Sequence, residues 1–387
     1  MGNETESIGI AGAGLLGRLL AWQLLLRGHR VSLFDAGTRA GVDSAAWTAA
    51  GMVAPLSEAV VSERPVYDMG LFALAQWPLW VNQLESEHTL WHQQGSLVVS
   101  HPQDEAELSQ FHRELQYVTE TADGYQWVTR PELHDLEPDL SDRFQRGLLL
   151  EAEGFLNNRE LLSQLLTTIE RLGGDCHFEC PVNVDEGILY SAGQQYRFDR
   201  VIDCRGVGAK PQQPAVRGVR GEVLHVHTRE IVLHRPVRLM HPRYQLYIVP
   251  KPDHRFVIGA TQIESEDRSP MSLQSSLELG SALYTLSPAF AEARILEQPV
   301  NLRPTYLDNN PHIETTEGLI TVNGLFRHGY LLAPAVVKQV LAEIAGEEDT
   351  PFARFLQRPI PNASQGAGHL SSEPLSQEPL SKEPAHD

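Results

Sequence analysis

The chain has 387 residues, enough for two domains, and carries 31 Lys and Arg against 50 Asp and Glu, a formal net charge of −19. This charge, with no basic run, disfavours a nucleic-acid partner, because phosphate binding needs clustered Lys and Arg. No apolar run approaches the roughly 20 residues of a membrane span, and Glu4 and Glu6 stand where a secretory signal would be positive, so we predict a cytoplasmic protein without a membrane partner.

The first predicted unit is a strand, a glycine turn, a helix and a second strand over residues 10–35. Gly12, Gly14 and Gly17 have the G-x-G-x-x-G spacing of a dinucleotide site. We expect Gly12 to permit the tight turn, Gly14 to let a pyrophosphate approach, and Gly17 to let the helix pack closely, with the helix N-terminus facing the phosphates. Asp35 ends the second strand, where it can accept hydrogen bonds from ribose hydroxyls. The turn does not distinguish NAD from FAD.

The next elements have local signals of their own. Small residues dominate from 43 to 55, as expected where backbone lies close to a ligand. The periodicity then predicts a helix over 66–94 that breaks or kinks at Pro78, a strand over 95–100, helices over 104–120 and 160–172, and β runs over 176–184 and 187–198.

The three cysteines do not suggest a disulfide framework or a zinc site. Cys176 and Cys180 fall in one predicted strand, where residues four apart are separated by about 13 Å, too far to bridge. The histidines show no metal-ligand spacing, and we predict no metal.

The second half of the chain is predicted to contribute further elements to the nucleotide-binding unit. Residues 199–210 predict a strand and glycine turn that come back beside the first strand, and 218–263 predict an antiparallel layer. A helix over 272–286, a strand over 297–307, and a strand, turn and helix over 318–346 follow. Two nucleotide-contact segments at opposite ends of the chain suit FAD better than NAD.

The last residues differ in kind. LSSEP, LSQEP and LSKEP repeat between 370 and 384, and are too polar to bury. We predict that 359–387 form a disordered tail.

Five segments, AAGMVAP, LMHPRYQLYIVP, FVIGAT, NLRP and FRHGYLLAP, occur in this order. In them the chain resembles the D-amino-acid oxidase superfamily, and within it the glycine oxidases of the thiamine pathway. The resemblance implies an α/β protein: a Rossmann-type FAD-binding domain with an inserted, largely antiparallel-sheet substrate domain of α+β type. The implied FAD-binding domain comprises 1–80, 145–217 and 315–358, and the substrate domain 81–144 and 218–314.

The resemblance also implies the residues that hold a non-covalent FAD. They come from the glycine turn and its helix, the acid at the ribose, the small-residue segment that faces the flavin ring, a backbone contact to the adenine, and the start of the last helix. The residues are Gly12, Gly14, Leu15, Leu16, Gly17, Asp35, Ala50, Gly51, Met52, Val182, His328, Gly329, Tyr330 and Leu331.

Four side chains are implied at the substrate. Arg303 matches the carboxylate-binding arginine, a role that suits its planar, permanently charged fork. Tyr247 adds a hydroxyl donor, with Gln245 on its face of the strand and Tyr244 on the other. Arg327 is implied near the amine or the flavin edge, and Met52 near ring and substrate. The plain alternatives are a surface Arg303, a half-buried sheet Tyr247 and a core Met52.

The implied activity is oxidation of glycine or a similar small amino acid by hydride transfer to the flavin, with O₂ as acceptor, H₂O₂ as product, and the imine serving thiazole formation. An FAD-dependent dehydrogenase of a D-amino acid, sarcosine or proline with another acceptor is the main alternative. A tRNA-modifying flavoprotein conflicts with the acidic charge, and a flavin-binding protein without catalysis would have no use for Arg303 and Tyr247. A homo-oligomer is compatible with all of these.

Overall fold

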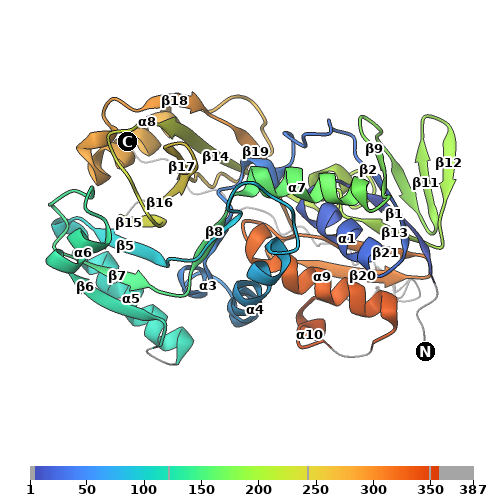
Figure 1. Ribbon diagram of the computed structural model, residues 1–387, viewed down its shortest axis with the longest axis horizontal. Coiled ribbons are helices and arrows are strands. Elements are labelled where there is room, and N and C mark those ends of the chain that lie inside the picture. Colours follow the sequence, from blue (N-terminus) through green and yellow to red (C-terminus); the bar gives the residue numbers. More distant parts are fainter. Residues whose placement is uncertain (1–4, 121–122, 242–243, 348–349, 357–387) are drawn as a thin grey trace, which may run out of the picture.

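The computed structural model describes residues 5–120, 123–241, 244–347 and 350–356. Two sheets lie side by side along the long axis of the molecule, the one with the N-terminal strand at the right of Figure 1 and the larger one at the left. This is the predicted α/β architecture with a second, largely antiparallel sheet. The predicted disordered tail, 359–387, lies outside the described residues.

The smaller sheet has six strands in the order β20-β21-β13-β1-β2-β9. Its strands are parallel apart from β20, which is antiparallel to β21. The strand predicted to return beside the first one does so, since Ile10 pairs with Ile202. The bounds are β1 (Ser7–Ala11), β2 (Arg30–Phe34), β9 (Asp175–His177), β13 (Arg200–Asp203), β20 (His312–Thr316) and β21 (Leu319–Asn323).

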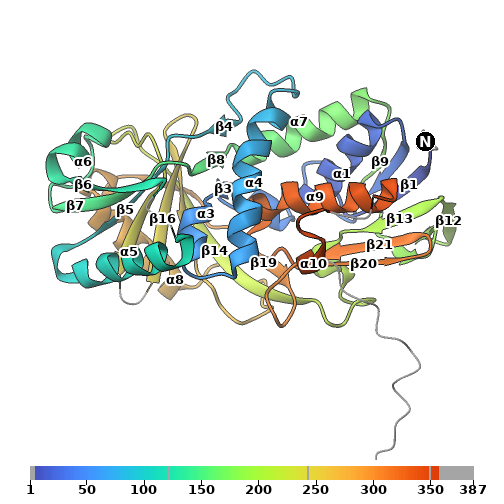
Figure 2. The ribbon, with the colours of Figure 1, turned by 90° about the horizontal axis from the view of Figure 1, so that it is seen from below.

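Both faces of this sheet are covered. Ile8 and Ile10 of β1 belong to the core packed by the helices, whereas Ala11, Phe34 and Val201 face a second cluster beneath a small meander. Figure 2 shows the helices on one side of the strands and the meander on the other. The helices are α1 (Leu15–Leu26), α4 (Arg64–Val81), α7 (Asn158–Arg171) and α9 (Gly329–Ala345), with α10 (Ala353–Leu356) against α9; the meander is β10 (Asn183–Asp185), β11 (Ile188–Ser191) and β12 (Gln194–Arg197).

The larger sheet follows the order β18-β14-β17-β16-β15-β5-β7-β6, and β19 also pairs with β14. Only β5 and β15 are parallel among these pairs. The bounds are β5 (Ser96–Ser100), β6 (Tyr125–Thr129), β7 (Arg146–Leu150), β14 (Arg217–His227), β15 (Val237–His241), β16 (Tyr244–Lys251), β17 (Arg255–Gly259), β18 (Arg294–Glu297) and β19 (Val300–Thr305). Because β7 pairs with β5 and β6, this sheet extends past the domain boundary predicted at residue 144.

Alternation along β5 explains how this sheet is covered. Leu97 and Val99 face a core that includes α8, whereas Val98 faces one that includes α3 and α5. The helices are α3 (Pro55–Ala59), α5 (Glu105–Thr119), α6 (Arg130–Leu136) and α8 (Leu273–Leu286); the remaining short elements are α2 (Ala45–Thr48), β3 (Met52–Val53), β4 (Trp91–His92) and β8 (Gly154–Leu156).

Two predicted elements were too long. The helix expected over 66–94 ends at Val81, three residues after Pro78, whose missing N–H falls in the last turn. The β run over 176–184 breaks because Glu179 has φ +52° and the Cys180 N–H bonds to the Asp35 carbonyl at 2.8 Å. Cys180 therefore lies outside a strand, and all three cysteines are free thiols. Among the helices of the described part, none is long and apolar enough to cross a membrane.

Candidate active site

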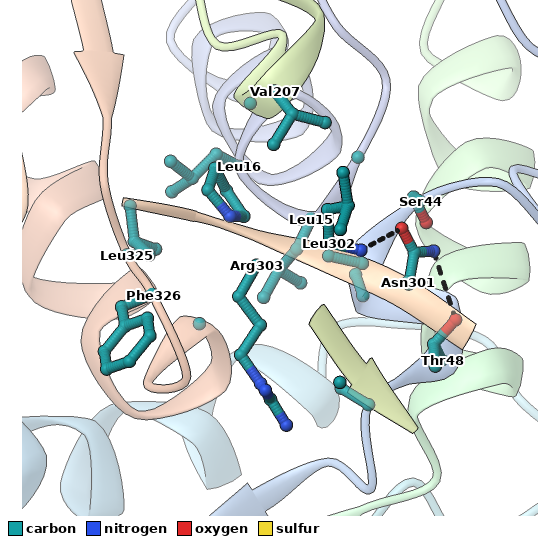
Figure 3. Close-up of a pocket in the computed structure, with 18 of the residues that line it drawn as sticks. Leu15, Leu16, Ser44, Thr48, Val207, Asn301, Leu302, Arg303, Leu325 and Phe326 are labelled. Atoms are coloured by element: carbon teal, nitrogen blue, oxygen red, sulfur yellow. Dashed lines mark hydrogen bonds between the residues drawn. The ribbon is translucent and has the colours of Figure 1, made fainter. Parts of the chain in front are cut away.

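A cavity of about 560 Å³ lies where the two sheets meet, and it is lined by segments from both ends of the chain. Every site residue predicted from the sequence lines this cavity except Gly17. Figure 3 shows Leu15 and Leu16 at one end and Arg303 reaching from β19 toward the other. The structure thus brings the predicted cofactor and substrate residues into one continuous space.

The glycine turn has the geometry that each of its glycines was predicted to serve. Gly12 has φ +103°, which glycine adopts without strain. A Cβ on Gly17 would lie 1.8 Å from the Gly12 carbonyl oxygen, so only glycine allows this packing. A Cβ on Gly14 would meet no protein atom within 4 Å. Gly14 faces the cavity, which leaves room for a ligand where α1 begins.

Asp35 lies beside this turn at the end of β2. Its two carboxylate oxygens accept from the Ala13 N–H at 2.5 Å and the Gly37 N–H at 2.7 Å. Each oxygen keeps a further lone pair for a ligand hydroxyl. The carboxylate therefore orders the turn and is available to a ribose.

Two helices start at the cavity. α1 begins at Leu15, and α9 begins at Gly329 with His328 as its N-cap. Phe326, just before α9, has φ +50°, and its N–H bonds to the Pro304 carbonyl, which joins this turn to β19. The N-termini of both helices offer unpaired N–H groups and positive dipole ends to an anionic ligand.

Residues 50–52 form a wall of the cavity. The Leu156 N–H donates to the Gly51 carbonyl at 2.8 Å, and Met52 pairs with Phe155 of β8. Gly51 has φ +76° and a Cβ there would lie 2.6 Å from the Leu156 carbonyl oxygen. The small residues at 50 and 51 therefore let the chain run flat between β8 and the cavity.

Val182 lies at the far end, where an adenine was predicted. Arg205 Nη1 donates to its carbonyl at 2.8 Å, which ties one of the two backbone groups of Val182 to the protein. Its N–H is the group left to offer to a base.

Arg303 projects from β19, and its charged guanidinium is largely buried. Its Nη1 and Nη2 donate to the carbonyls of Arg220 at 3.2 Å and Thr261 at 3.0 Å. No carboxylate among the described residues pairs with it. Burial lowers the pKa of the guanidinium, and the nearby Tyr247 opposes that shift. Arg303 is thus a partly satisfied cation with donors free for an added carboxylate.

Tyr247 shares the cavity with Arg303. Its hydroxyl lies across Gly259 of β17, where a Cβ would be 2.6 Å away. Burial raises the pKa of this hydroxyl, with Arg303 acting in the opposite direction, so Tyr247 keeps its proton and can donate it in a hydrogen bond. Met52 packs in the same cluster as Tyr247. The side chains of Tyr244 and Gln245 lie outside the described residues.

Arg327 belongs to a charged cluster that sequence reasoning missed. Its Nη2 lies 2.8 Å from Oε2 of Glu58, which also contacts His328 Nε2 at 3.0 Å. Arg238 Nη2 lies 3.1 Å from the other oxygen, Oε1. Burial alone would raise the pKa of Glu58, but the charge of Arg327, then His328 and Arg238, holds it well below its usual range. Glu58 therefore stays ionised and holds Arg327 at the cavity. Its only signal in the sequence was an acid three residues after the small-residue segment 43–55.

Gly221 is a second residue that sequence reasoning missed, because the Arg303 guanidinium lies flat on it. A Cβ there would be 2.4 Å from Cζ of Arg303.

We expect Gly221→Ala to displace the guanidinium of Arg303 and to raise the KM for the substrate by roughly tenfold or more, with little change in Tm. Gly280→Ala on α8, where a Cβ meets no atom within 4 Å, is the matched control and should leave KM unchanged. An unchanged KM in Gly221→Ala would show that Arg303 does not hold the substrate.

Comparison with known proteins agrees with this geometry. The family model described as FAD dependent oxidoreductase matches residues 7–344. The protein belongs to this family. It is 38% identical over 345 residues to a protein assigned as the thiamine biosynthesis oxidoreductase ThiO of Rhizobium etli, covering 89% of this chain and 98% of that one.

Solved structures share the fold of this oxidoreductase. Glycine oxidase from Geobacillus kaustophilus superposes with a TM-score of 0.79 at 23% identity, over 91% of this chain and 98% of that chain. Iminodiacetate oxidase from Chelativorans sp. BNC1 gives 0.78 at 20% identity, over 90% and 98%. The protein is therefore an FAD-dependent oxidoreductase with the glycine oxidase fold.

The cavity fits FAD. The opening at Gly14, the two helix N-termini and the Asp35 carboxylate provide complementary groups for a pyrophosphate and a ribose. None of the three cysteines belongs to the last motif, so the cofactor is expected to be non-covalent. The individual residue roles stay predictions.

Proposed function

We propose that this protein oxidises glycine or a similar small amino acid. The observation that carries the proposal is Arg303, a cation without a carboxylate partner among the described residues, placed with Tyr247 in the cavity that fits FAD. A guanidinium fork and a phenol hydroxyl are suited to the two oxygens of an α-carboxylate. Met52 lines the same cavity.

The protein groups act by binding and orientation. Arg303 and Tyr247 hold the carboxylate, which fixes the α-carbon against the wall at residues 50–52, and Glu58 keeps Arg327 at the cavity. FAD, when bound, supplies the hydride acceptor. No side chain has to remove a proton from the α-carbon, because the neutral amine's lone pair assists hydride loss.

The overall reaction we propose converts glycine, water and O₂ to glyoxylate, ammonia and H₂O₂. The similarity to ThiO of Rhizobium etli supports a further assignment, that the imine formed first is used in thiamine biosynthesis. A cytoplasmic location and assembly with further copies of the chain stay predictions.

A peroxide assay tests the activity. The purified holoprotein should release one H₂O₂ for each glycine consumed, and small amino acids should be oxidised faster than bulky ones. The dehydrogenase alternative is correct if sarcosine, proline or a D-amino acid reduces the flavin, and if the reduced flavin then passes its electrons to a quinone or dye but not to O₂.

A further inference from the structure

Lys251, the last residue of β16, places its ammonium directly behind the cavity wall at residues 50–52. Its Nζ donates to the carbonyls of Ala50 and Leu156, both at 2.7 Å, and to Oδ1 of Asn158 at 3.1 Å. The Phe155 ring lies 5.4 Å from Nζ. These acceptors are neutral, and no carboxylate of the described residues pairs with the ammonium.

The wall itself is thin. Ala50 is 4% exposed, and that exposed surface faces the cavity. Since Nζ contacts the Ala50 carbonyl, a ligand in van der Waals contact with the other side of this residue lies within about 8 Å of the ammonium. At that distance inside a protein, a unit charge changes the equilibrium of a nearby anion by roughly tenfold or more.

We infer that Lys251 is a positioning residue for the flavin: its ammonium fixes the wall at residues 50–52 and raises the reduction potential of the FAD that this wall contacts. The inference rests on the proposed placement of the flavin ring against this wall. Reduction adds negative charge to the flavin, and a fixed cation behind the wall stabilises that charge.

Several charged or titratable groups of the described residues lie around Lys251. They are Arg159 on α7, His225 on β14, Glu297 on β18, Arg255 on β17 and His92 on β4. Arg159 and Glu297 form an ion pair at 2.8 Å. Burial lowers the pKa of His225 to about 4 and also lowers the pKa of His92, so both rings are neutral at pH 7. Burial, then Arg159, lowers the pKa of Lys251 to about 7.

The effect of Lys251 on the flavin reduction potential depends on pH. Lys251 is charged below about pH 7 and loses its charge above it, so this effect is largest in mild acid. Reduction of the flavin raises the pKa of Lys251 by linkage, which extends the effect somewhat above pH 7.

The test is the midpoint potential of the bound FAD, measured with a chemical reductant. At pH 6, Lys251→Gln should shift the two-electron equilibrium about tenfold toward oxidised flavin, a potential about 30 mV lower, and the difference should shrink toward pH 9. Lys338→Gln is the matched control, because Lys338 also lies over a phenylalanine ring, 5.0 Å from Phe72, but outside this cavity. It should leave the potential unchanged.

Two further variants separate charge from wall geometry. Lys251→Arg should give a higher potential than wild type at pH 9, because arginine keeps its charge there; a destabilised wall would not produce this gain. Asn158→Ala removes a wall anchor and one of the three acceptors of Lys251 but keeps the charge, so it should lower the potential far less than Lys251→Gln does.

The inference is overturned if Lys251→Gln matches wild type at pH 6, or if Asn158→Ala reproduces its shift. The chemical reductant gives the potential whatever the substrate is. A holoprotein that ignores glycine but shows the Lys251 shift would therefore contradict the proposed function alone.

Discussion

Arg303→Ala should raise the KM for glycine by roughly a hundredfold or more. The variant removes a charged fork whose two hydrogen bonds to a carboxylate are each worth about 1.5–3 kcal/mol in a desolvated place. Tm should change little, because Arg303 bonds only two backbone carbonyls among the described residues. Steady-state kinetics in saturating O₂, with Tm of the holoprotein, measures both quantities.

The control for this result is a substrate without a carboxylate. Glycine methyl ester keeps the amine and the α-carbon, so Arg303→Ala should affect its turnover far less than that of glycine. Arg303→Lys should fall between wild type and Arg303→Ala, since a lysine keeps the charge but not the fork. Equal losses for glycine and its ester would place Arg303 in a structural role.

Alanine at Gly14 and at Gly17 should both weaken FAD binding by at least about tenfold, for different reasons. At Gly14 a Cβ meets no protein atom within 4 Å, so the apoprotein should keep its Tm, and the methyl group should block only the cofactor. At Gly17 the Cβ would overlap the Gly12 carbonyl oxygen at 1.8 Å, so the turn must move and the apoprotein Tm should fall by several degrees.

Thermal unfolding of the two apoproteins, with and without added FAD, measures this contrast. FAD should raise the Tm of wild type through binding to the folded state, and should raise that of both variants less. A Gly14→Ala protein that binds FAD as tightly as wild type would place the pyrophosphate elsewhere.

The parts predicted well from sequence are those with a local physical cause. The glycine spacing at 12, 14 and 17 defines a turn within six residues, and the strand, helix and strand predicted around it are β1, α1 and β2. The helix expected over 66–94 was too long because apolar residues continue beyond Pro78, whereas α4 ends at Val81, about one turn after that proline.

The site was only partly predictable, because several of its contacts join distant segments. Glu58 meets Arg238 and His328 across 180 and 270 residues, and no spacing rule predicts such a meeting. Lys251 reaches Ala50 across 201 residues, and a lone lysine at the end of a strand normally faces solvent. Arg303 itself was predicted from the resemblance, whereas its contact with Gly221 required the structure.

The visible spectrum of the purified protein, recorded without oxygen before and after adding glycine, tests the central claim most directly. A yellow protein whose flavin bands bleach with glycine and return with peroxide when air is admitted is the predicted result. Flavin bands that glycine leaves unchanged, while sarcosine, proline or a D-amino acid bleaches them, would contradict the proposed substrate.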